Sequence, residues 1–349
     1  MTQTQQWQLK SHPKGLPTYK GADPTFELVK KDLPALQDGQ ILVKVQYFSN
    51  DPAQRGWIDY YPDESRLYVP AIHEGERMQA FALAEVIESK ADNIKKGDIV
   101  SGGTGWTEYA VVSAQAVRVV EPLPNGLPIT HYLGALGMTG LTAYSGLIEV
   151  AQATKDDVVV VSGAAGATGS MVVQIAKKIL GCKKVIGIAG GAKKCEWVKK
   201  LGADECIDYK SADFQEQLTK ATPEFANVYF DNVGGEILDF MLTRMARHGR
   251  VAVCGAISNY NAKEGEKGEV LKNWFQVISM RLHLRGLIVL DHAAKFGQIL
   301  QEFRKALQEG KLDIAEGEHV VETKFEDVPG TWLKLFEGVN TGKLITKLV

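Results

Sequence analysis

The sequence predicts an α/β protein with a β-rich first domain and a second domain built on a doubly wound parallel sheet. Its 349 residues are enough for two domains of the usual size, roughly 100–200 residues each. Short strands without helices between them fill the first ~120 residues, whereas strands and helices alternate from Val158 onward. These two patterns, and the change from one to the other, predict the fold class.

The first domain shows four segments with the β-branched or alternating pattern of strands, separated by Gly, Pro or Asp. These segments are residues 41–49, 81–89, 98–103 and 106–113. Such spacing is typical of a small barrel or sandwich. The Pro- and Gly-rich stretch 121–128 then indicates a turn or linker.

The second domain shows six apolar segments with helical patterns between them. The predicted strands are 158–163, 184–189, 205–209, 227–234, 249–255 and 283–289, and the predicted helices are 170–180, 193–202, 213–221, 236–246 and 292–309. Continuous apolar strands that alternate with helices indicate a parallel sheet covered on both faces.

The tail has a β pattern again, in residues 319–327 and 343–349. We therefore expect the chain to return to its first domain. The predicted boundaries are 1–125, completed by 312–349, for the first domain and 126–311 for the second.

Charge and hydropathy exclude several classes of protein. Lys and Arg number 40 against 42 Asp and Glu, a net charge of −2, whereas a nucleic-acid-binding chain usually shows a basic excess. The apolar runs are broken well before the ~20 residues that a membrane span needs. The first ten residues lack the pattern of a signal peptide, so we expect a cytoplasmic location.

The four cysteines are Cys182, Cys195, Cys206 and Cys254. Their spacings match no zinc motif, and a disulfide framework is not expected in a cytosolic chain of this size. We predict that at least three of them are small buried apolar residues.

A glycine-rich turn, Ser162 to Gly169, joins the first strand of the second domain to a helix. Small residues in this context let the backbone approach a pyrophosphate, whose charge then lies at the helix N-terminus. The turn predicts a dinucleotide cofactor.

The end of the next strand indicates which dinucleotide binds. Sites selective for NAD place a carboxylate there, but residues 188–194 contain none and end in Lys193 and Lys194. Either lysine would attract a 2′-phosphate, and a lysine at a helix N-terminus otherwise opposes the helix dipole. We therefore predict NADPH.

The layout of the domains resembles the medium-chain dehydrogenase/reductase superfamily. Its zinc-dependent members use a catalytic Cys and a Gly-His-Glu segment, which correspond here to Ser49–Pro52 and Gly75–Arg77. No cysteine precedes Cys182, so we predict no metal site.

Six motifs resemble the zinc-independent branch, which contains prostaglandin reductases (leukotriene B4 12-hydroxydehydrogenases), alkenal double-bond reductases and curcumin reductases. They are Asn-Asp-Pro-Ala-Gln-Arg-Gly (50–56), Gly-Glu-Arg-Met (75–78), Leu-Thr-Ala-Tyr (141–144), Asp-Asn-Val-Gly-Gly (231–235), Cys-Gly-Ala-Ile-Ser-Asn-Tyr-Asn (254–261) and Gly-Leu-Ile-Val (286–289). The resemblance implies a GroES-like first domain, a Rossmann second domain and a homodimer. In the first motif Gln54 stands where the family usually has Met, which predicts a changed substrate wall.

The resemblance also implies the site residues. Pyrophosphate would be held by Gly166, Ala167, Thr168 and Gly169, and the 2′-phosphate by Lys194 and Tyr209. The ribose and nicotinamide would contact Asn232, Cys254, Gly255, Ala256, Ile257, Ser258, Tyr260, Leu287, Ile288, Val289 and Asn340.

These features predict an NADPH-dependent reductase that adds hydride to the β-carbon of an α,β-unsaturated aldehyde or ketone. Tyr260 follows a strand end, where doubly wound sheets bind ligands, and its phenol could donate a hydrogen bond to the carbonyl oxygen. We therefore predict that Tyr260 is catalytic, with packing on the ribose as the alternative. Two other functions stay open, a quinone reductase and a non-catalytic NADPH-binding protein.

Overall fold

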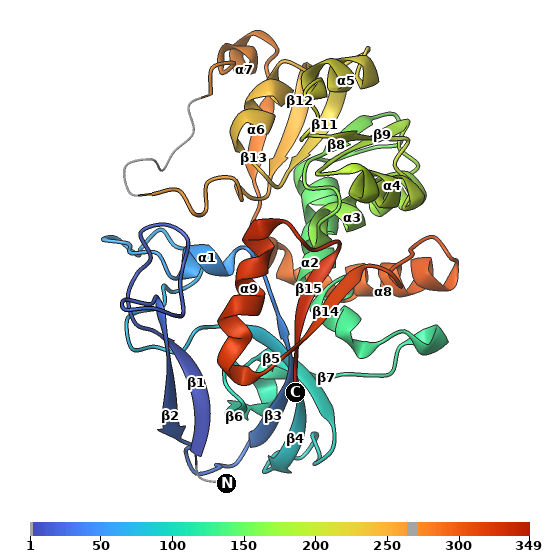
Figure 1. Ribbon diagram of the computed structural model, residues 1–349. Coiled ribbons are helices and arrows are strands. Elements are labelled where there is room, and N and C mark those ends of the chain that lie inside the picture. The colour runs from blue at the N-terminus through green and yellow to red at the C-terminus, as the bar shows by residue number, and fades with distance from the viewer. Residues whose placement is uncertain (1–2, 264–270) are drawn as a thin grey trace. The chain divides into compact units, whose positions relative to one another are not determined.

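The structure, a computed structural model, describes residues 3–263 and 271–349, and its contacts divide the chain into two units (Figure 1). Unit 1 comprises Met1–Gly134, Asn261–Glu264 and His319–Val349, and unit 2 comprises Ala135–Tyr260 and Gly265–Glu318. The predicted boundaries, after residues 125 and 311, each lie a few residues before these divisions. The sequence did not indicate that Asn261 belongs to unit 1.

Unit 1 contains a two-stranded sheet and a seven-stranded sheet. The smaller sheet pairs β1 (Gln3–Leu9) with β2 (Phe26–Asp32) in antiparallel orientation. The larger sheet has the order β14-β15-β3-β4-β5-β7, and β6 also pairs with β3. Its strands are β3 (Gln40–Ser49), β4 (Phe81–Ser89), β5 (Ile99–Gly103), β6 (Tyr109–Ser113), β7 (Val117–Val119), β14 (Glu318–Thr323) and β15 (Lys343–Leu348).

The return of the tail to unit 1 is visible in this sheet. β15 pairs antiparallel with β3, so that Ile345 lies opposite Ser49. Figure 1 shows the red C-terminal strands beside the blue and cyan strands of the N-terminal segment.

The core of unit 1 is rich in aromatic side chains. Trp106 and Trp332 are fully buried, and each packs against Phe26 and against the other. Trp332 belongs to α9 (Val328–Glu337), and the remaining helix of this unit is α1 (Gln54–Trp57). Aromatic rings bury large areas and pack edge to face, which fixes α9 against the sheet.

The sequence pattern did not predict β1, β2, β7 or either helix of unit 1. β1 begins with four polar residues and has apolar side chains only at Trp7 and Leu9, so its alternation is too short to identify a strand, and the burial of Gln6 and Gln8 is seen only in the structure. The two short helices are four and ten residues long and lie between strands, where no long helical period could be read.

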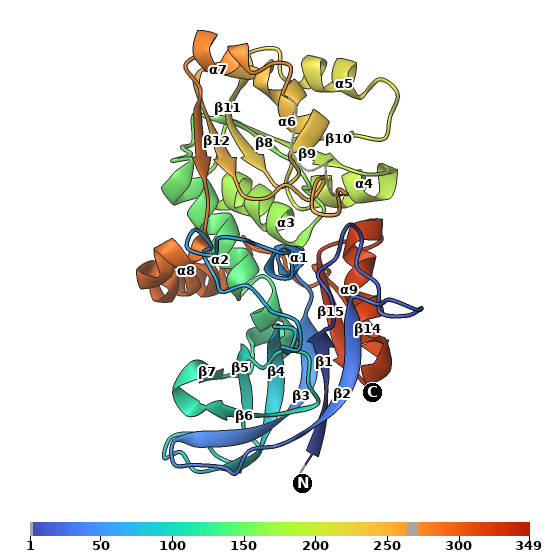
Figure 2. The same cartoon turned by 90° about the vertical axis from the view of Figure 1, so that its left-hand side faces the viewer.

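Unit 2 has the predicted parallel sheet, with six strands in the order β10-β9-β8-β11-β12-β13 (Figure 2). The strands are β8 (Val158–Val161), β9 (Lys184–Ala189), β10 (Glu205–Asp208), β11 (Ala226–Asp231), β12 (Met245–Val253) and β13 (His283–Gly286). The order runs outward in both directions from β8, which is the doubly wound arrangement and confirms the predicted fold class.

The helices of unit 2 are α2 (Met138–Tyr144), α3 (Ala167–Gln174), α4 (Ala192–Lys200), α5 (Phe214–Ala221), α6 (Gly235–Leu242), α7 (Phe275–Ser279) and α8 (Phe296–Gln308). Val160 and Ile186 share a buried cluster with Leu218 of α5 and Met241 of α6. Gly187 points to the opposite face, where a Cβ would meet Val198 of α4. Both faces are therefore covered by helices, as predicted.

Several element ends differ from the prediction. In unit 1 the strand predicted for 106–113 begins at Tyr109, and the one predicted for 319–327 ends at Thr323. Three further ends differ in unit 2. The strand predicted for 227–234 ends at Asp231, and the strand predicted for 283–289 ends at Gly286. The helix predicted for 236–246 ends at Leu242, and Met245 already pairs with Ala226 of β11. After Gly286 the apolar run Leu287–Val289 continues although the strand has ended, and in the other two cases single apolar residues follow the end, so the pattern alone does not mark it.

The cysteine prediction was wrong in part. Cys182 and Cys195 are buried, but Cys206 and Cys254 are only half-buried, and all four are reduced. Among the residues that the structure describes, no helix has both the length and the apolar character required to cross a membrane.

Candidate cofactor-binding and active site

The predicted cofactor residues of unit 2 all follow the carboxyl ends of its parallel strands. Because parallel strands share one direction, these ends lie at the same edge of the sheet. Gly166–Gly169 follow β8, Lys194 follows β9 and Tyr209 follows β10. Asn232 follows β11, Cys254–Tyr260 follow β12 and Leu287–Val289 follow β13.

The glycine-rich turn brings the backbone close to the N-terminus of α3. Gly166 is the N-cap of this helix and has no side chain to satisfy the first N–H groups. A Cβ at Gly169 would lie 2.3 Å from the carbonyl oxygen of Gly163, so only glycine fits there. The helix therefore presents its first N–H groups and its positive dipole end without an obstructing side chain, which suits a pyrophosphate.

A second turn, at the end of β9, carries the features expected for a 2′-phosphate. A Cβ at Gly190 would lie 2.8 Å from the ring of Tyr209, so the glycine allows the aromatic ring to pack on the backbone. Lys210 places its ammonium group 6.0 Å from the centroid of the same ring. Tyr209 is 46% exposed, so this ring forms a surface beside the turn.

Lys194 stands on α4 next to this turn. Burial lowers the pKa of its ammonium group, and repulsion from Lys210 lowers it further. Lys210 is thus close enough to disfavour the charge on Lys194. A doubly charged phosphate placed near both would remove that repulsion, which is the electrostatic situation of an anion site.

Asp208, which the sequence reasoning missed, shapes the same turn. Its Oδ1 accepts hydrogen bonds from the N–H groups of Gly191, at 2.8 Å, and Lys210, at 2.9 Å. The carboxylate lies on β10 rather than at the end of β9, where a carboxylate would indicate NAD. No local pattern connects Asp208 to a turn 17 residues earlier in the chain.

A buried carboxylate organises the loop after β11. Asp231 is fully buried, and its Oδ1 accepts hydrogen bonds from the hydroxyls of Ser162 and Tyr229, at 3.0 and 2.8 Å. The same oxygen accepts from the N–H groups of Val233 and Gly234, at 3.1 and 3.0 Å. These bonds turn the chain out of the sheet directly after Asp231.

The same network holds Asn232. Its N–H donates to the Ser162 hydroxyl at 2.9 Å, and its side-chain amide donates to the Ser162 carbonyl at 2.7 Å. Asn232 is thus fixed beside the start of the glycine-rich turn. Asp231 and Ser162 belong to motifs that the sequence singled out, but neither was assigned a role.

Replacing Asp231 should be strongly destabilising. Asp231→Ala would leave two hydroxyls and two N–H groups without their acceptor in a buried site, and we expect a loss of about 3–5 kcal/mol in the free energy of unfolding. Asp231→Asn keeps an oxygen at Oδ1 and should lose less than half as much. Denaturant titration of both variants measures the difference, and equal losses would contradict this account.

The segment after β12 folds onto the loop after β11. The Ser258 hydroxyl and N–H both donate to the Val233 carbonyl, at 2.6 and 3.2 Å. The N–H of Ala256 donates to the Tyr260 hydroxyl at 3.3 Å, so the phenol lies back over its own turn, close to Gly255. Asn232 and the segment 254–260 therefore form one continuous wall, and its contact with the ribose and nicotinamide stays a prediction.

Cys254 and Leu287 complete this wall. Burial raises the pKa of the Cys254 thiol to about 12, and the Asp231 carboxylate adds to the effect. The N–H of Leu287 donates to the Val253 carbonyl at 3.0 Å, and the Leu287 side chain is buried. Ile288 and Val289 are half-buried. At neutral pH Cys254 is a neutral thiol, not a nucleophilic thiolate.

Comparisons with known proteins match both units. Residues 5–120 match the family model described as N-terminal domain of oxidoreductase, and residues 167–309 match the one described as zinc-binding dehydrogenase. The chain is 37% identical to prostaglandin reductase 1 of Bos taurus, over 99% of this chain and 100% of that protein. The chain belongs to the medium-chain dehydrogenase/reductase family.

Other members of the family are similar over the whole chain. The NADPH-dependent curcumin reductase of Escherichia coli is 34% identical, over 98% of this chain and 96% of that protein. The crystal structure of CurA from Vibrio vulnificus, in complex with NADPH, has a TM-score of 0.87 and 33% identity and covers 99% of both chains. The family identity predicted from the sequence is thereby confirmed.

A zinc site such as that of the family's zinc-dependent members needs several ligands that lie close together. Within residues 3–263 and 271–349, no group of three or more His, Cys, Asp or Glu side chains is arranged to hold a metal ion.

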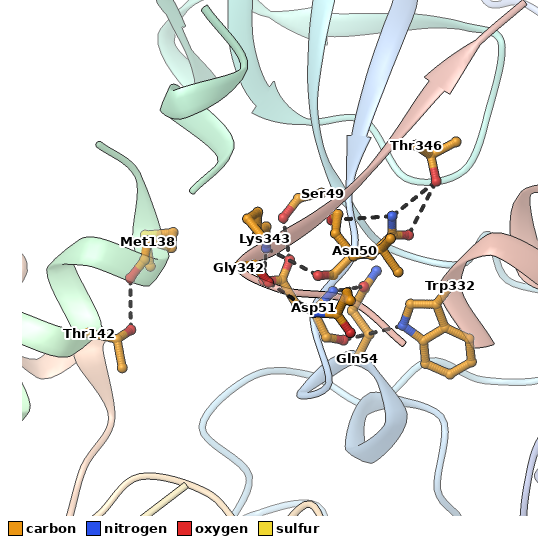
Figure 3. A network of polar contacts seen from close by, with 12 residues as sticks. Ser49, Asn50, Asp51, Gln54, Met138, Thr142, Trp332, Gly342, Lys343 and Thr346 are labelled. Carbon is orange, nitrogen blue, oxygen red and sulfur yellow. Dashed lines mark hydrogen bonds and ion pairs between the residues drawn. The ribbon is translucent and has the colours of Figure 1, made fainter. Parts of the chain in front are cut away.

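The segment Ser49–Pro52, for which the resemblance predicts the position of the catalytic cysteine of the zinc-dependent members, takes part in a polar network of unit 1 (Figure 3). Lys343 of β15 is only 3% exposed, and its ammonium group forms an ion pair of 2.5 Å with Oδ1 of Asp51. The Ser49 hydroxyl donates to the other oxygen, Oδ2, at 2.5 Å. The network ties the first motif to the returning strand, and it was not predicted from the sequence.

Asn340, the predicted cofactor residue outside unit 2, lies in unit 1 between α9 and β15. Its side-chain amide donates to the Gly342 carbonyl at 2.9 Å. The division of the chain thus separates Asn340 from the other predicted cofactor residues, and its role stays a prediction.

The Gln54 side chain is fully buried, so it has no exposed face that could line a substrate site. Its Oε1 accepts from the Asp51 N–H at 2.8 Å, and its Nε2 donates to the Gln79 carbonyl at 2.8 Å. Gln54, the residue that departs from the family pattern, therefore connects the first motif to Gln79, shortly before β4, through two hydrogen bonds.

Restoring the family's usual residue should cost stability. Gln54→Met would leave the Asp51 N–H and the Gln79 carbonyl without partners, so we expect the free energy of unfolding to fall by about 1–3 kcal/mol. The exposed Gln115→Met should change it by less than about 0.5 kcal/mol in the same denaturant titration. A Gln54→Met variant as stable as the wild type would contradict the bridging role.

Proposed function

We propose that this protein reduces the C=C bond of α,β-unsaturated aldehydes and ketones with NADPH, by hydride transfer to the β-carbon. It is an NADP-dependent oxidoreductase of the prostaglandin and curcumin reductase type. The observation that supports the proposal most directly is the single edge of the sheet, where the glycine-rich turn, the lysine-bearing turn and the Tyr260 turn meet.

The residues of unit 2 fit NADPH. The N–H groups at the start of α3 would bind the pyrophosphate, because the glycines leave the backbone open there. Lys194 would bind the 2′-phosphate beside the Tyr209 ring, and Asn232 with residues 254–260 would hold the ribose and nicotinamide. When bound, NADPH supplies the hydride and the reducing electrons.

Tyr260 is proposed to stabilise the charge that develops on the substrate. Addition at the β-carbon moves electron density onto the carbonyl oxygen, where a hydrogen-bond donor lowers the energy of the transition state. A phenol can accept from the Ala256 N–H and also donate through its own proton. The Ala256 bond orients the ring, because it fixes the hydroxyl relative to the end of β12.

A substrate panel tests the proposal. NADPH oxidation would be followed with a 2-alkenal, a saturated ketone and a quinone, each in the absence and presence of the protein. Turnover of the alkenal to the saturated aldehyde, with no turnover of the ketone, is the expected result. Preference for the quinone would favour the quinone reductase instead.

Binding without turnover of any acceptor would favour the non-catalytic NADPH-binding protein. NADPH binding is therefore measured separately, by quenching of tryptophan fluorescence or by calorimetry, so that a loss of binding is distinguished from a lack of chemistry. The homodimer, the cytoplasmic location and the small-molecule enal or enone partner remain part of this proposal.

A further inference from the structure

Two cysteines of unit 2 lie in contact with each other, and neither belongs to the proposed catalytic machinery. The Cys206 thiol on β10 donates a hydrogen bond to the Cys195 sulfur on α4, with 2.9 Å between the two sulfur atoms. A disulfide holds its sulfurs about 2.05 Å apart, so less than about 1 Å separates this pair from bonding distance. Both thiols are reduced in the structure.

The backbone on either side fixes this approach. The turn between α4 and β10 is anchored by Asp204, whose N–H donates to the Val185 carbonyl and whose carboxylate accepts from the Val185 N–H at 2.7 Å. Gly187 of β9 lies beneath the pair, and a Cβ there would be 3.3 Å from the Cys206 sulfur and 2.6 Å from Val198. The backbone of α4, β9 and β10 therefore sets the positions of the two sulfurs, which face each other.

The surroundings keep both groups as thiols at neutral pH. Burial raises the pKa of Cys195 and of Cys206. Two nearby charges also act on the pair: Lys199 on α4 lowers both pKa values, and Asp208 on β10 raises them. The residue of β9 that lies next to the pair is the uncharged Gly187. Because the thiolate is the reactive form, each cysteine alone reacts slowly with an oxidant. Disulfide formation therefore depends on the second cysteine lying close to the first.

We propose that Cys195 and Cys206 are an oxidation site that forms an intramolecular disulfide with low-molecular-weight disulfides such as oxidised glutathione. The half-buried Cys206 attacks the oxidant, whose S–S bond breaks and releases one thiol. Cys195 then attacks the Cys206 sulfur of the mixed disulfide and releases the second thiol. The protein loses two protons and two electrons, and the oxidant is reduced to two thiols.

The bond would join the helix that carries Lys194 to the strand that ends at Asp208. The proposal is independent of the function proposed above, because disulfide formation is read from the covalent structure and not from activity.

Peptide mapping of the wild-type protein tests it. After incubation with oxidised glutathione at mildly alkaline pH, free thiols are alkylated in denaturant and the protein is digested with trypsin. Cys195 and Cys206 fall in separate peptides, 195–199 and 201–210, so their disulfide appears as a linked pair. We expect this pair, an intact mass lowered by two hydrogen atoms, and reversal by dithiothreitol.

The matched control is Cys182→Ser, which removes a buried thiol that hydrogen-bonds to the Thr154 carbonyl in the same unit. This variant should form the linked pair as the wild type does, whereas Cys195→Ser and Cys206→Ser should not lose the two hydrogen atoms. Four singly alkylated cysteines after oxidation of the wild type would overturn the proposal. A disulfide between two chains, or one that involves Cys182 or Cys254, would overturn it as well.

Discussion

Tyr260→Phe should lower kcat for an alkenal by about tenfold to a thousandfold while the affinity for NADPH barely changes. The substitution removes only the hydroxyl that is proposed to donate to the carbonyl oxygen, and loss of one such donor costs roughly 1.4–4 kcal/mol in the transition state. Steady-state kinetics with a fixed alkenal, together with an NADPH titration, measures the two quantities separately.

The alternative is that Tyr260 only packs on the cofactor. In that case Tyr260→Phe keeps nearly normal kcat, because the ring is retained, and Tyr260→Ala chiefly weakens NADPH binding. The hydroxyl also accepts from the Ala256 N–H, so the Phe variant should be checked for a small loss of thermal stability. Near-normal turnover by a folded Tyr260→Phe protein would remove the catalytic assignment.

Lys194→Ala should raise the KM for NADPH by about tenfold or more and leave the KM for NADH nearly unchanged. A charge-assisted contact with the 2′-phosphate is worth roughly 1.5–3 kcal/mol, which is one to two decades of affinity. NADH lacks this phosphate. The matched control is Lys193→Ala, since Lys193 is the preceding residue of α4 but is exposed.

The lowered pKa of Lys194 adds a pH signature. The protonated amine binds the phosphate, so its contribution is present below the pKa and is lost as the pH rises through it. Because burial and Lys210 shift that pKa downward, the affinity for NADPH should begin to fall at a lower pH than for an ordinary lysine. Lys194→Ala should abolish this dependence. Equal use of NADH and NADPH by the wild type would contradict the assignment.

The sequence predicted the parts of the site that lie in continuous segments. The glycine-rich turn lies between an apolar strand and a helix, and Lys194 lies in the first turn of the helix after the next strand. Both could therefore be located from the pattern of neighbouring residues. The six strands of unit 2 were predicted from apolar segments that alternate with helical patterns, although only β8 and β9 are nearly continuous apolar runs.

The features that were missed depend on contacts between distant segments. Lys343 and Asp51 are 292 residues apart, and neither position carries a local signal of an ion pair. Asp231 could have been suspected, because a carboxylate directly after the buried residues Val228–Phe230 is unusual, but its four donors come from the turn after β8, from β11 and from the following loop. β1 was missed because its inward side chains include glutamines, whose burial only the folded sheet reveals.

The position of β15 has a consequence for how the chain is made. Residues 343–348 lie between β14 and β3, yet they follow the whole of unit 2 in the sequence. During synthesis β6 can pair with residues 40–44 of β3, but residues 47–49 of β3 lack their partner until β15 has been made, whereas the six strands of unit 2 are all available earlier. We expect unit 2 to be the first folded body on the nascent chain. Until β15 is available, residues 47–49 of β3 are the place where chaperone binding or misassembly would occur.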